Sequence, residues 1–121
     1  MQVGFDPPTV CVAVGQHRTH LDTIQASGRF ALSILDTDSS RLMGVFFKKY
    51  PEGESALDHV ETEDSPGGLP VLSEALAWLD CQVTGLHKTG DHAVVFGTVE
   101  HGEMLREGDP VIHLRKNGLS Y

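Results

Sequence analysis

The chain has 121 residues, of which 40% are hydrophobic and 21% are charged, and this composition predicts one globular domain over residues 1–121. A formal net charge of -8 excludes a broadly basic surface for nucleic acid and disfavours adsorption to anionic membranes. No apolar run approaches the roughly 20 residues that are needed to cross a bilayer, so we expect no membrane segment.

Residues 1–8 contain no basic segment followed by an apolar stretch, so the sequence predicts no secretory signal and a cytoplasmic location. The two cysteines, Cys11 and Cys81, each lie in an apolar segment. We expect both to be reduced, buried thiols, with a disulfide or a metal pair as the alternative.

Strand and helix signals alternate in the first part of the chain. Asp6–Pro8 is predicted to be a stiff, extended lead-in, because proline fixes φ and the residue before it avoids helix. The β-branched run Thr9–Val14 indicates a strand that is buried on both faces. After a polar loop, Thr19 is a candidate cap for a helix that Gly28 can end. Arg29–Leu35 alternates as a second, largely buried strand.

The middle of the chain carries one further helix signal. Apolar residues at helical spacing predict a helix over Ser40–Tyr50, which Pro51 closes. Glu52–Gly68 is rich in acidic residues, glycine, serine and proline without a period, and it is predicted to be an irregular surface segment.

Strand signals return after Leu69. Ala77–Thr84 alternates as a strand, although propensity alone also allows a helix over Ser73–Leu79. Lys88–Gly90 supplies a turn, and Asp91–His101 alternates as a strand that should pair antiparallel with the preceding one. Val111–Leu114 is predicted to be a last, short strand.

Taken together, several short strands and two helices predict a mainly β fold, a small β-barrel with α crossovers, rather than a doubly wound parallel sheet. The sequence contains no Gly-x-Gly-x-x-Gly motif after a strand and no P-loop. A Rossmann dinucleotide site is therefore excluded.

Seven histidines invite a metal hypothesis, which the spacing does not support. His17 and His20 form a His-x-x-His pair, but no third ligand or neighbouring base accompanies them. We expect no metal site. The sequence also lacks a Gly-x-Ser-x-Gly nucleophile motif, which disfavours a serine hydrolase.

Two polar segments are candidate sites. Gln16–Thr19 would bring backbone amides, the Arg18 guanidinium and the Thr19 hydroxyl to a helix N-terminus, which favours an anion. The same residues also suit a plain helix cap with a solvated arginine. Gly90–His92 is a turn at the start of a strand, where His92 could carry chemistry or simply face solvent.

The order and spacing of several segments resemble the flavin reductase-like family over essentially the whole chain. Residues 46–53 and 113–121 are similar to the flavin reductase modules of flavodiiron proteins. The segments that carry the resemblance are Phe5–Val14, Arg29–Leu35, Leu76–Val83 and Gly90–Val99.

The resemblance implies an FMN-binding split β-barrel that forms a homodimer. It further implies FMN, with FAD as the alternative, bound at the dimer interface and reduced by NADH or NADPH for a downstream acceptor. In this family pattern Gln16, His17, Arg18 and Thr19 match the loop at the flavin phosphate. His92 matches the histidine near the isoalloxazine and nicotinamide rings, and His113, Arg115 and Tyr121 match the closing segment near the bound nucleotides.

The family pattern places further strands ahead of Phe-x-Pro-Pro, whereas here Met1 almost adjoins that motif. The resemblance therefore implies a barrel that is incomplete at the N-terminus and has an unpaired edge. Two alternatives to a flavin reductase follow. One is a non-catalytic FMN-binding module that relays electrons, and the other is a truncated, dimerising domain that binds no flavin.

Overall fold

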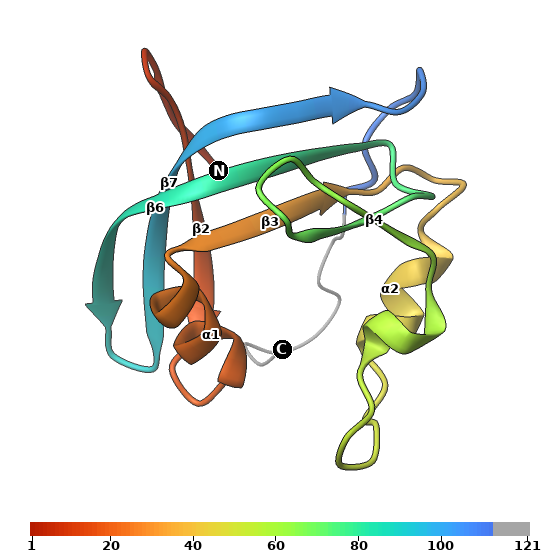
Figure 1. The fold of residues 1–121 in the computed structure, drawn as a ribbon, viewed down its shortest axis with the longest axis horizontal. Helices are drawn as coiled ribbons and strands as arrows, with labels where there is room; N and C mark the ends of the chain where they lie inside the picture. The colour runs from red at the N-terminus through yellow and green to blue at the C-terminus, as the bar shows by residue number, and fades with distance from the viewer. Residues whose placement is uncertain (113–121) are drawn as a thin grey trace.

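One curved antiparallel sheet organises residues 1–112, the part of the chain that the computed structural model describes. Its strand order is β1-β2-β7-β6-β3 (Figure 1). Within these residues β1 pairs only with β2 and β3 only with β6, so both are edge strands. The predicted antiparallel, mainly β architecture is confirmed. The strands are β1 (Gln2–Phe5), β2 (Pro8–Gly15), β3 (Arg29–Ile34), β6 (Ala77–Thr89) and β7 (His92–Met104).

Helix α1 (Thr19–Ser27) follows β2 and packs against β2 and β3. It ends as predicted at Gly28, which adopts the left-handed φ of 68° and donates its amide to the Ile24 carbonyl at 2.8 Å. The predicted cap was wrong. Arg18 occupies the N-cap position without a side-chain bond, and Thr19 is already the first helical residue.

Helix α2 (Arg41–Phe46) is shorter than the predicted helix over residues 40–50. Near its C-terminus, a carbonyl accepts hydrogen bonds from residues beyond the helix, where the chain turns away from the helix axis. The Val45 carbonyl accepts the Lys48 amide at 3.3 Å and the Tyr50 hydroxyl at 2.9 Å. These bonds take the place of further i to i−4 hydrogen bonds, so α2 ends at Phe46. The apolar residues at helical spacing continue to Tyr50, beyond the end of the helix.

The segment predicted to be irregular holds a 3-10 helix at Ala56–His59 and strand β4 (Thr62–Asp64). Strand β4 forms a hairpin with β5 (Pro70–Leu72), so the prediction of no regular structure was wrong there. All residues of β4 are exposed, and a strand that short carries no alternation to detect. The competing helix over residues 73–79 does not form, since β6 begins at Ala77.

Two predictions about the first strands need correction. Asp6 and Pro7 form the turn of a hairpin in which Phe5 pairs with Pro8, rather than an extended lead-in. Strand β2 is not buried on both faces: Ala13 is exposed, while Val12 on the neighbouring position is half-buried against the core. A single sheet layer with α1 on one side leaves the other side of β2 partly open.

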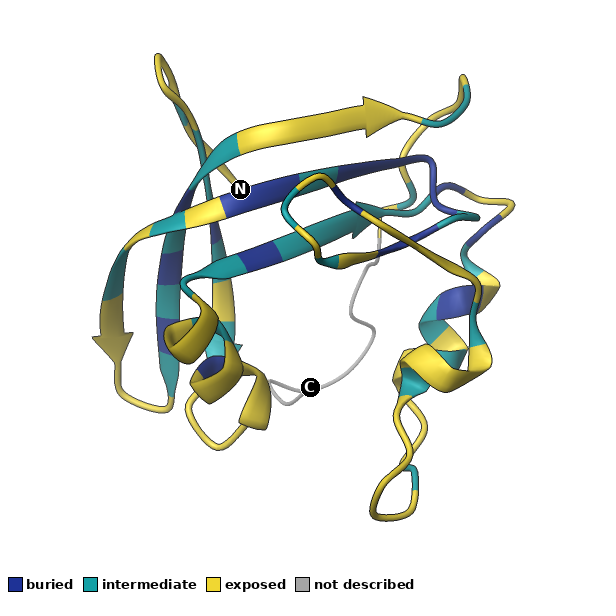
Figure 2. Cartoon of the chain, in the orientation of Figure 1, coloured by how far each residue is buried: buried dark blue, intermediate teal, exposed yellow. Residues whose placement is uncertain are grey.

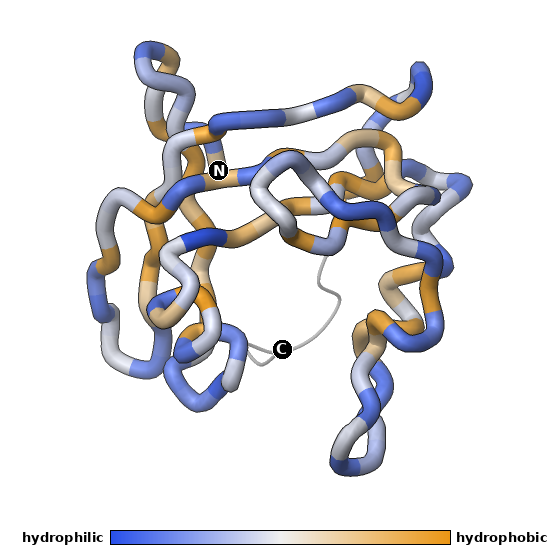
Figure 3. The backbone as a smooth tube through the Cα atoms, viewed as in Figure 1, coloured by the Kyte–Doolittle hydropathy of each residue, from blue (hydrophilic) through white to orange (hydrophobic). Residues whose placement is uncertain are grey.

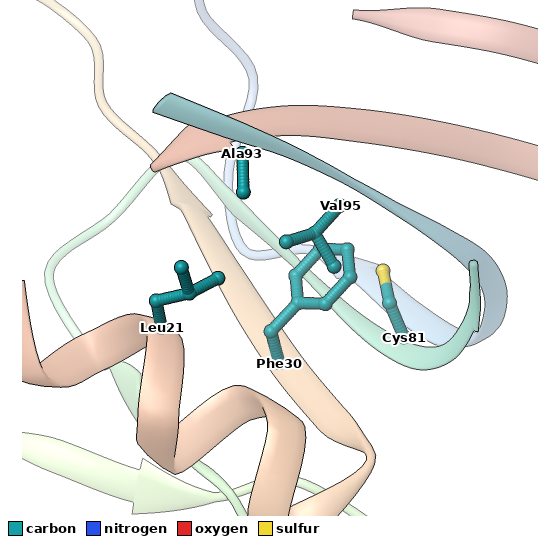
Figure 4. Close-up of a cluster of buried hydrophobic side chains, with 5 residues drawn as sticks. All are labelled: Leu21, Phe30, Cys81, Ala93 and Val95. Carbon is teal, nitrogen blue, oxygen red and sulfur yellow. The ribbon is translucent and has the colours of Figure 1, made fainter. Parts of the chain in front are cut away.

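The hydrophobic core lies between α1 and the inner face of the sheet. Figure 4 shows its side chains pointing toward one another from one helix and three strands. In Figure 2 the buried residues concentrate in the central strands, and in Figure 3 the same strands are the most hydrophobic. The members of the cluster are Leu21, Phe30, Cys81, Ala93 and Val95.

Cys11 and Cys81 are both free and buried, as predicted. Burial raises the pKa of Cys81 to about 11, and the neighbouring Asp80 carboxylate acts in the same direction. A thiol with so high a pKa is a poor nucleophile near neutral pH, which fits a packing role.

Strands β6 and β7 pair antiparallel as predicted and run further, to Thr89 and Met104. Gly90 closes their turn with a φ of 65°. The predicted strand over residues 111–114 does not form at Val111 and Ile112, and Leu114 lies outside the described residues. No helix among residues 1–112 is long and apolar enough to span a membrane.

Candidate functional site

The two candidate segments, far apart in sequence, meet at one end of the sheet. Strand β2 pairs with β7 so that Gly15 lies opposite His92. The loop after β2 and the turn before β7 therefore lie side by side, next to the start of α1 (Figure 1). We define residues 16–19 and 90–92 as the candidate site.

Gln16 holds the Gly90–His92 turn through its backbone and its side chain. Its amide donates to the Asp91 carbonyl at 2.9 Å. Its Nε2 donates to the His92 carbonyl at 3.2 Å and also to the Gly90 carbonyl. The family pattern matched Gln16 to the flavin-phosphate loop, and the structure commits its side-chain donors to the turn instead.

His92, the predicted catalytic residue, is half-buried and pairs with its neighbour. Its Nδ1 lies 2.8 Å from Oδ1 of Asp91, whose side chain is 90% exposed. The hydrogen bond from His92 and the charge of that ring lower the pKa of Asp91, and His17 adds a smaller effect. Asp91 thus remains a carboxylate that orients the imidazole.

Arg18 provides a cation that has no carboxylate partner among residues 1–112. Among residues 1–112 it is the arginine whose guanidinium forms no ion pair, whereas Arg29, Arg41 and Arg106 each pair with a carboxylate. The N-terminus of α1 also lacks a side-chain cap. A helix start without a side-chain cap, beside a guanidinium that forms no ion pair within residues 1–112, favours a bound anion such as phosphate.

The other predicted loop residues frame this corner. A Cβ at Gly15 would lie 3.0 Å from Cε1 of His17, so glycine lets the His17 ring fold back over the strand end. The Thr19 carbonyl accepts the Thr23 hydroxyl at 3.1 Å within α1. Across the described part of the chain, no three potential metal ligands cluster, His17 and His20 included.

The remaining predicted site residues, His113, Arg115 and Tyr121, lie outside the described residues. Sequence reasoning did not identify two contacts, that of Gln16 with the turn and that of the His92 ring with the Asp91 carboxylate. The Gly-Asp-His sequence is a local signal that could have pointed to Asp91. No spacing pattern could have revealed the Gln16 contact, because 74 residues separate Gln16 from Gly90.

An open pocket of about 690 Å³ lies at the opposite end of β6 and β7, and the sequence did not predict it. Glu100 in its wall pairs with Arg29 at 2.8 Å, whereas the remaining carboxylates form no ion pair within residues 1–112. Its lining is Glu63, Asp64, Ser65, Pro66, Val71, Trp78, Glu100, His101, Gly102 and Glu103.

Known proteins resemble the chain in sequence. Residues 1–118 match the model of the flavin reductase-like domain family. Diflavin flavoprotein A 1 of Synechocystis is 35% identical over 99% of this chain and 21% of its own length. A diflavin flavoprotein A 6 of Nostoc is 34% identical over the same shares. The chain thus spans about a fifth of the curated relatives that it matches.

Solved structures share the fold. The flavin reductase PheA2 is 34% identical with a TM-score of 0.75, covering 91% of this chain and 68% of that one. The NADH:FAD oxidoreductase SgcE6 of Streptomyces globisporus is 27% identical with a TM-score of 0.78, covering 85% and 62%.

These solved structures are flavin reductase split barrels, and their similarity agrees with the mainly β, antiparallel architecture described above. The family model spans nearly all of the sequence, and the resemblance seen in the sequence segments is confirmed. The chain belongs to the flavin reductase-like domain family.

Proposed function

We propose that the chain is a flavin reductase, in which bound FMN is reduced by a nicotinamide nucleotide. One observation carries the proposal: the anion-favouring loop at Arg18 and the histidine turn at His92 are joined by hydrogen bonds at one corner. A phosphate-bearing cofactor held by the loop would extend over the turn, where the reacting rings must meet.

The loop has the donors that a flavin phosphate requires. The Arg18 guanidinium forms no ion pair within the described residues, and no side chain caps the start of α1. Both would therefore bind a dianionic phosphate without first breaking an internal bond. Gln16 belongs to the same loop, but its donors bond to the Gly90–His92 turn. We propose that His17 and Thr19 lie beside the bound phosphate.

We propose that His92 acts on the nicotinamide or on charge that develops in the flavin. A bound flavin supplies the chemistry itself, because its N5 accepts a hydride from nicotinamide C4. The Asp91 carboxylate orients the His92 ring through the contact at Nδ1. A cationic imidazole there would stabilise the negative charge of a reduced flavin.

The names of related proteins support a flavin as the cofactor. Relatives at 34–35% identity are called diflavin flavoproteins, and one structural neighbour is an NADH:FAD oxidoreductase. We propose FMN as the flavin, with FAD as the alternative, and NADH or NADPH as the donor. We further propose that the protein forms a homodimer and passes reduced flavin or its electrons to a downstream acceptor.

Steady-state oxidation of NADH and NADPH by the full chain, with FMN or FAD added, tests the proposal. We expect a rate well above that of free flavin with at least one donor. A protein that turns yellow with FMN yet oxidises neither donor would instead be a flavin-binding relay. A colourless protein without a thermal shift on adding FMN would contradict flavin binding altogether.

A further inference from the structure

We infer that Gln16 is a positioning residue that sets the placement of His92, an inference that rests on the proposed function. Three consecutive carbonyls, those of Gly90, Asp91 and His92, accept hydrogen bonds from this one residue. No described residue outside the hairpin makes a comparable set of contacts to this turn.

The contacts use all the donors that Gln16 has. Its backbone N–H bonds to Asp91, and its Nε2 group bonds to the residues on either side. The remaining oxygen, Oε1, can only accept, so it would not attract a phosphate. The side chain is therefore better suited to holding the turn than to contacting the flavin phosphate, and the phosphate contacts fall to Arg18 and the helix amides.

The position of Gln16 in the chain makes it a link between both halves of the site. On one side it continues β2, where Gly15 lies opposite His92. On the other side the Arg18 amide donates to the Gly15 carbonyl at 3.0 Å, which folds the loop back beside Gln16. A displacement of the turn would therefore alter the distance between the phosphate position and the His92 ring.

Apart from Gln16, the turn is held by the strand pairings of His92 with Thr89 and with Gly15. Gly90 has a positive φ and an exposed position, and Asp91 is exposed as well. Within the hairpin the Thr89 hydroxyl reaches the His92 carbonyl at 3.3 Å. Loss of the two Nε2 bonds would free the Gly90 carbonyl to move, and the Asp91 carboxylate that orients His92 would move with it. Because the bonds are exposed, their loss should cost little global stability.

The experiment compares two variants of the full chain. Gln16→Met keeps the length but removes the donors, and Gln16→Glu keeps the shape but can only accept. Gln25→Met is the matched control, because Gln25 is exposed on α1 and makes no side-chain bond in the described residues. The readouts are the imidazole ¹⁵N signals of His92 across pH, the FMN dissociation constant, and kcat and KM for the nicotinamide.

We expect both Gln16 variants to shift the His92 ¹⁵N signals, while Gln25→Met leaves them unchanged. The value of kcat should fall roughly 10-fold, since small misplacements of a reacting group are costly. The FMN dissociation constant of Gln16→Met should stay within about 2-fold, because uncharged donors that are already used elsewhere contribute little to an anion. Gln16→Glu also adds a negative charge beside the phosphate position, so its FMN affinity is not used to decide the role of Gln16.

Unchanged His92 signals together with weakened FMN binding would overturn the inference and make Gln16 a flavin contact. Unchanged signals with unchanged kinetics would overturn it as well. The NMR comparison needs no turnover, so it decides the role of Gln16 even where the wild-type chain oxidises no nicotinamide. A wild-type chain that oxidises no nicotinamide would contradict the proposed function and leave the role of Gln16 to be decided by the NMR comparison.

Discussion

Arg29 and Asp80 lie diagonally across the β3–β6 pair, with Nη2 of the arginine 2.6 Å from Oδ1 of the carboxylate. Asp80 is completely buried, and it also accepts the Ser65 hydroxyl at 2.6 Å and the Gly67 amide at 2.8 Å. This network fastens the β4–β5 turn to the sheet. Removing one member of this network would leave its partners without a hydrogen bond, which lowers the free energy of unfolding.

Asp80→Ala should destabilise the chain by about 3 kcal/mol, because it removes one of the two carboxylate partners of Arg29 and leaves the Ser65 hydroxyl and the Gly67 amide without their acceptor. Urea unfolding followed by circular dichroism measures the free energy of unfolding. Asp64→Ala is the control, since Asp64 is exposed and lacks an ion pair among the described residues. Equal stability of the two variants would show that the network contributes little.

Gly67→Ala should lower stability by roughly 2 kcal/mol through crowding. A Cβ there would lie 2.3 Å from Oδ2 of Asp80 and 2.5 Å from Nη2 of Arg29. Gly44→Ala is the contrasting variant, because nothing lies within 4 Å of its Cβ position in helix α2. That change should raise stability by about 0.5–1 kcal/mol. In thermal melts, Gly67→Ala should lower the melting temperature and Gly44→Ala should raise it. Changes in the same direction for both variants would contradict the packing argument.

Acid should destabilise the fold through Asp36 and Asp80. The hydrogen bonds from Arg106 and Ser39 lower the pKa of Asp36. Burial raises the pKa of Asp80, but bonds from Ser65, Arg29 and Gly67 outweigh it and leave the pKa low. A carboxyl with a depressed folded-state pKa stabilises the fold above its unfolded value near 4, and this contribution is lost as the pH falls toward the folded value.

The melting temperature should therefore drop progressively below about pH 4. Asp36→Asn should start from a lower melting temperature at pH 7 and lose less of it between pH 4 and pH 2.5, since it has no carboxyl there to protonate. Scanning calorimetry across this range is the measurement. If Asp36→Asn lost as much melting temperature between pH 4 and pH 2.5 as the wild type does, the acid destabilisation would come from groups other than Asp36.

Arg18→Ala should weaken FMN binding roughly 10-fold while leaving the melting temperature of the apoprotein nearly unchanged, because the guanidinium supports an anion rather than the core. Fluorescence quenching of FMN gives the dissociation constant. Arg41→Ala removes a different exposed arginine, which pairs with Glu74 away from the site, and should leave FMN binding intact. An unaltered dissociation constant for Arg18→Ala would reject the phosphate role.

His92→Ala should reduce the rate of hydride transfer by about 100-fold with a much smaller change in flavin affinity. Stopped-flow absorbance at the flavin band, after mixing the FMN-loaded chain with NADH or NADPH, measures the rate. Parallel losses in rate and affinity would indicate that His92 shapes the site rather than acting on the reactants.

Local sequence signals were sufficient for several elements. The stop at Gly28 and the turn at Gly90 follow from the backbone freedom of glycine, and both were predicted. The β6–β7 hairpin followed from alternation around that turn. Strand β4 has no repeating pattern, and it was not predicted. Helix α2 is shorter than predicted, and the Tyr50 hydroxyl donates to the Val45 carbonyl near its end.

The sequence by itself determined the antiparallel strand content, the family and the residue types of the candidate site, since composition, periodicity and motif order are local properties. Only the tertiary structure decided that Gln16 holds the His92 turn and that Arg29 balances Asp80. Both depend on strand register, which brings together residues that lie 76 and 51 positions apart. Such pairings are set by the packing of the whole sheet, and no local pattern encodes them.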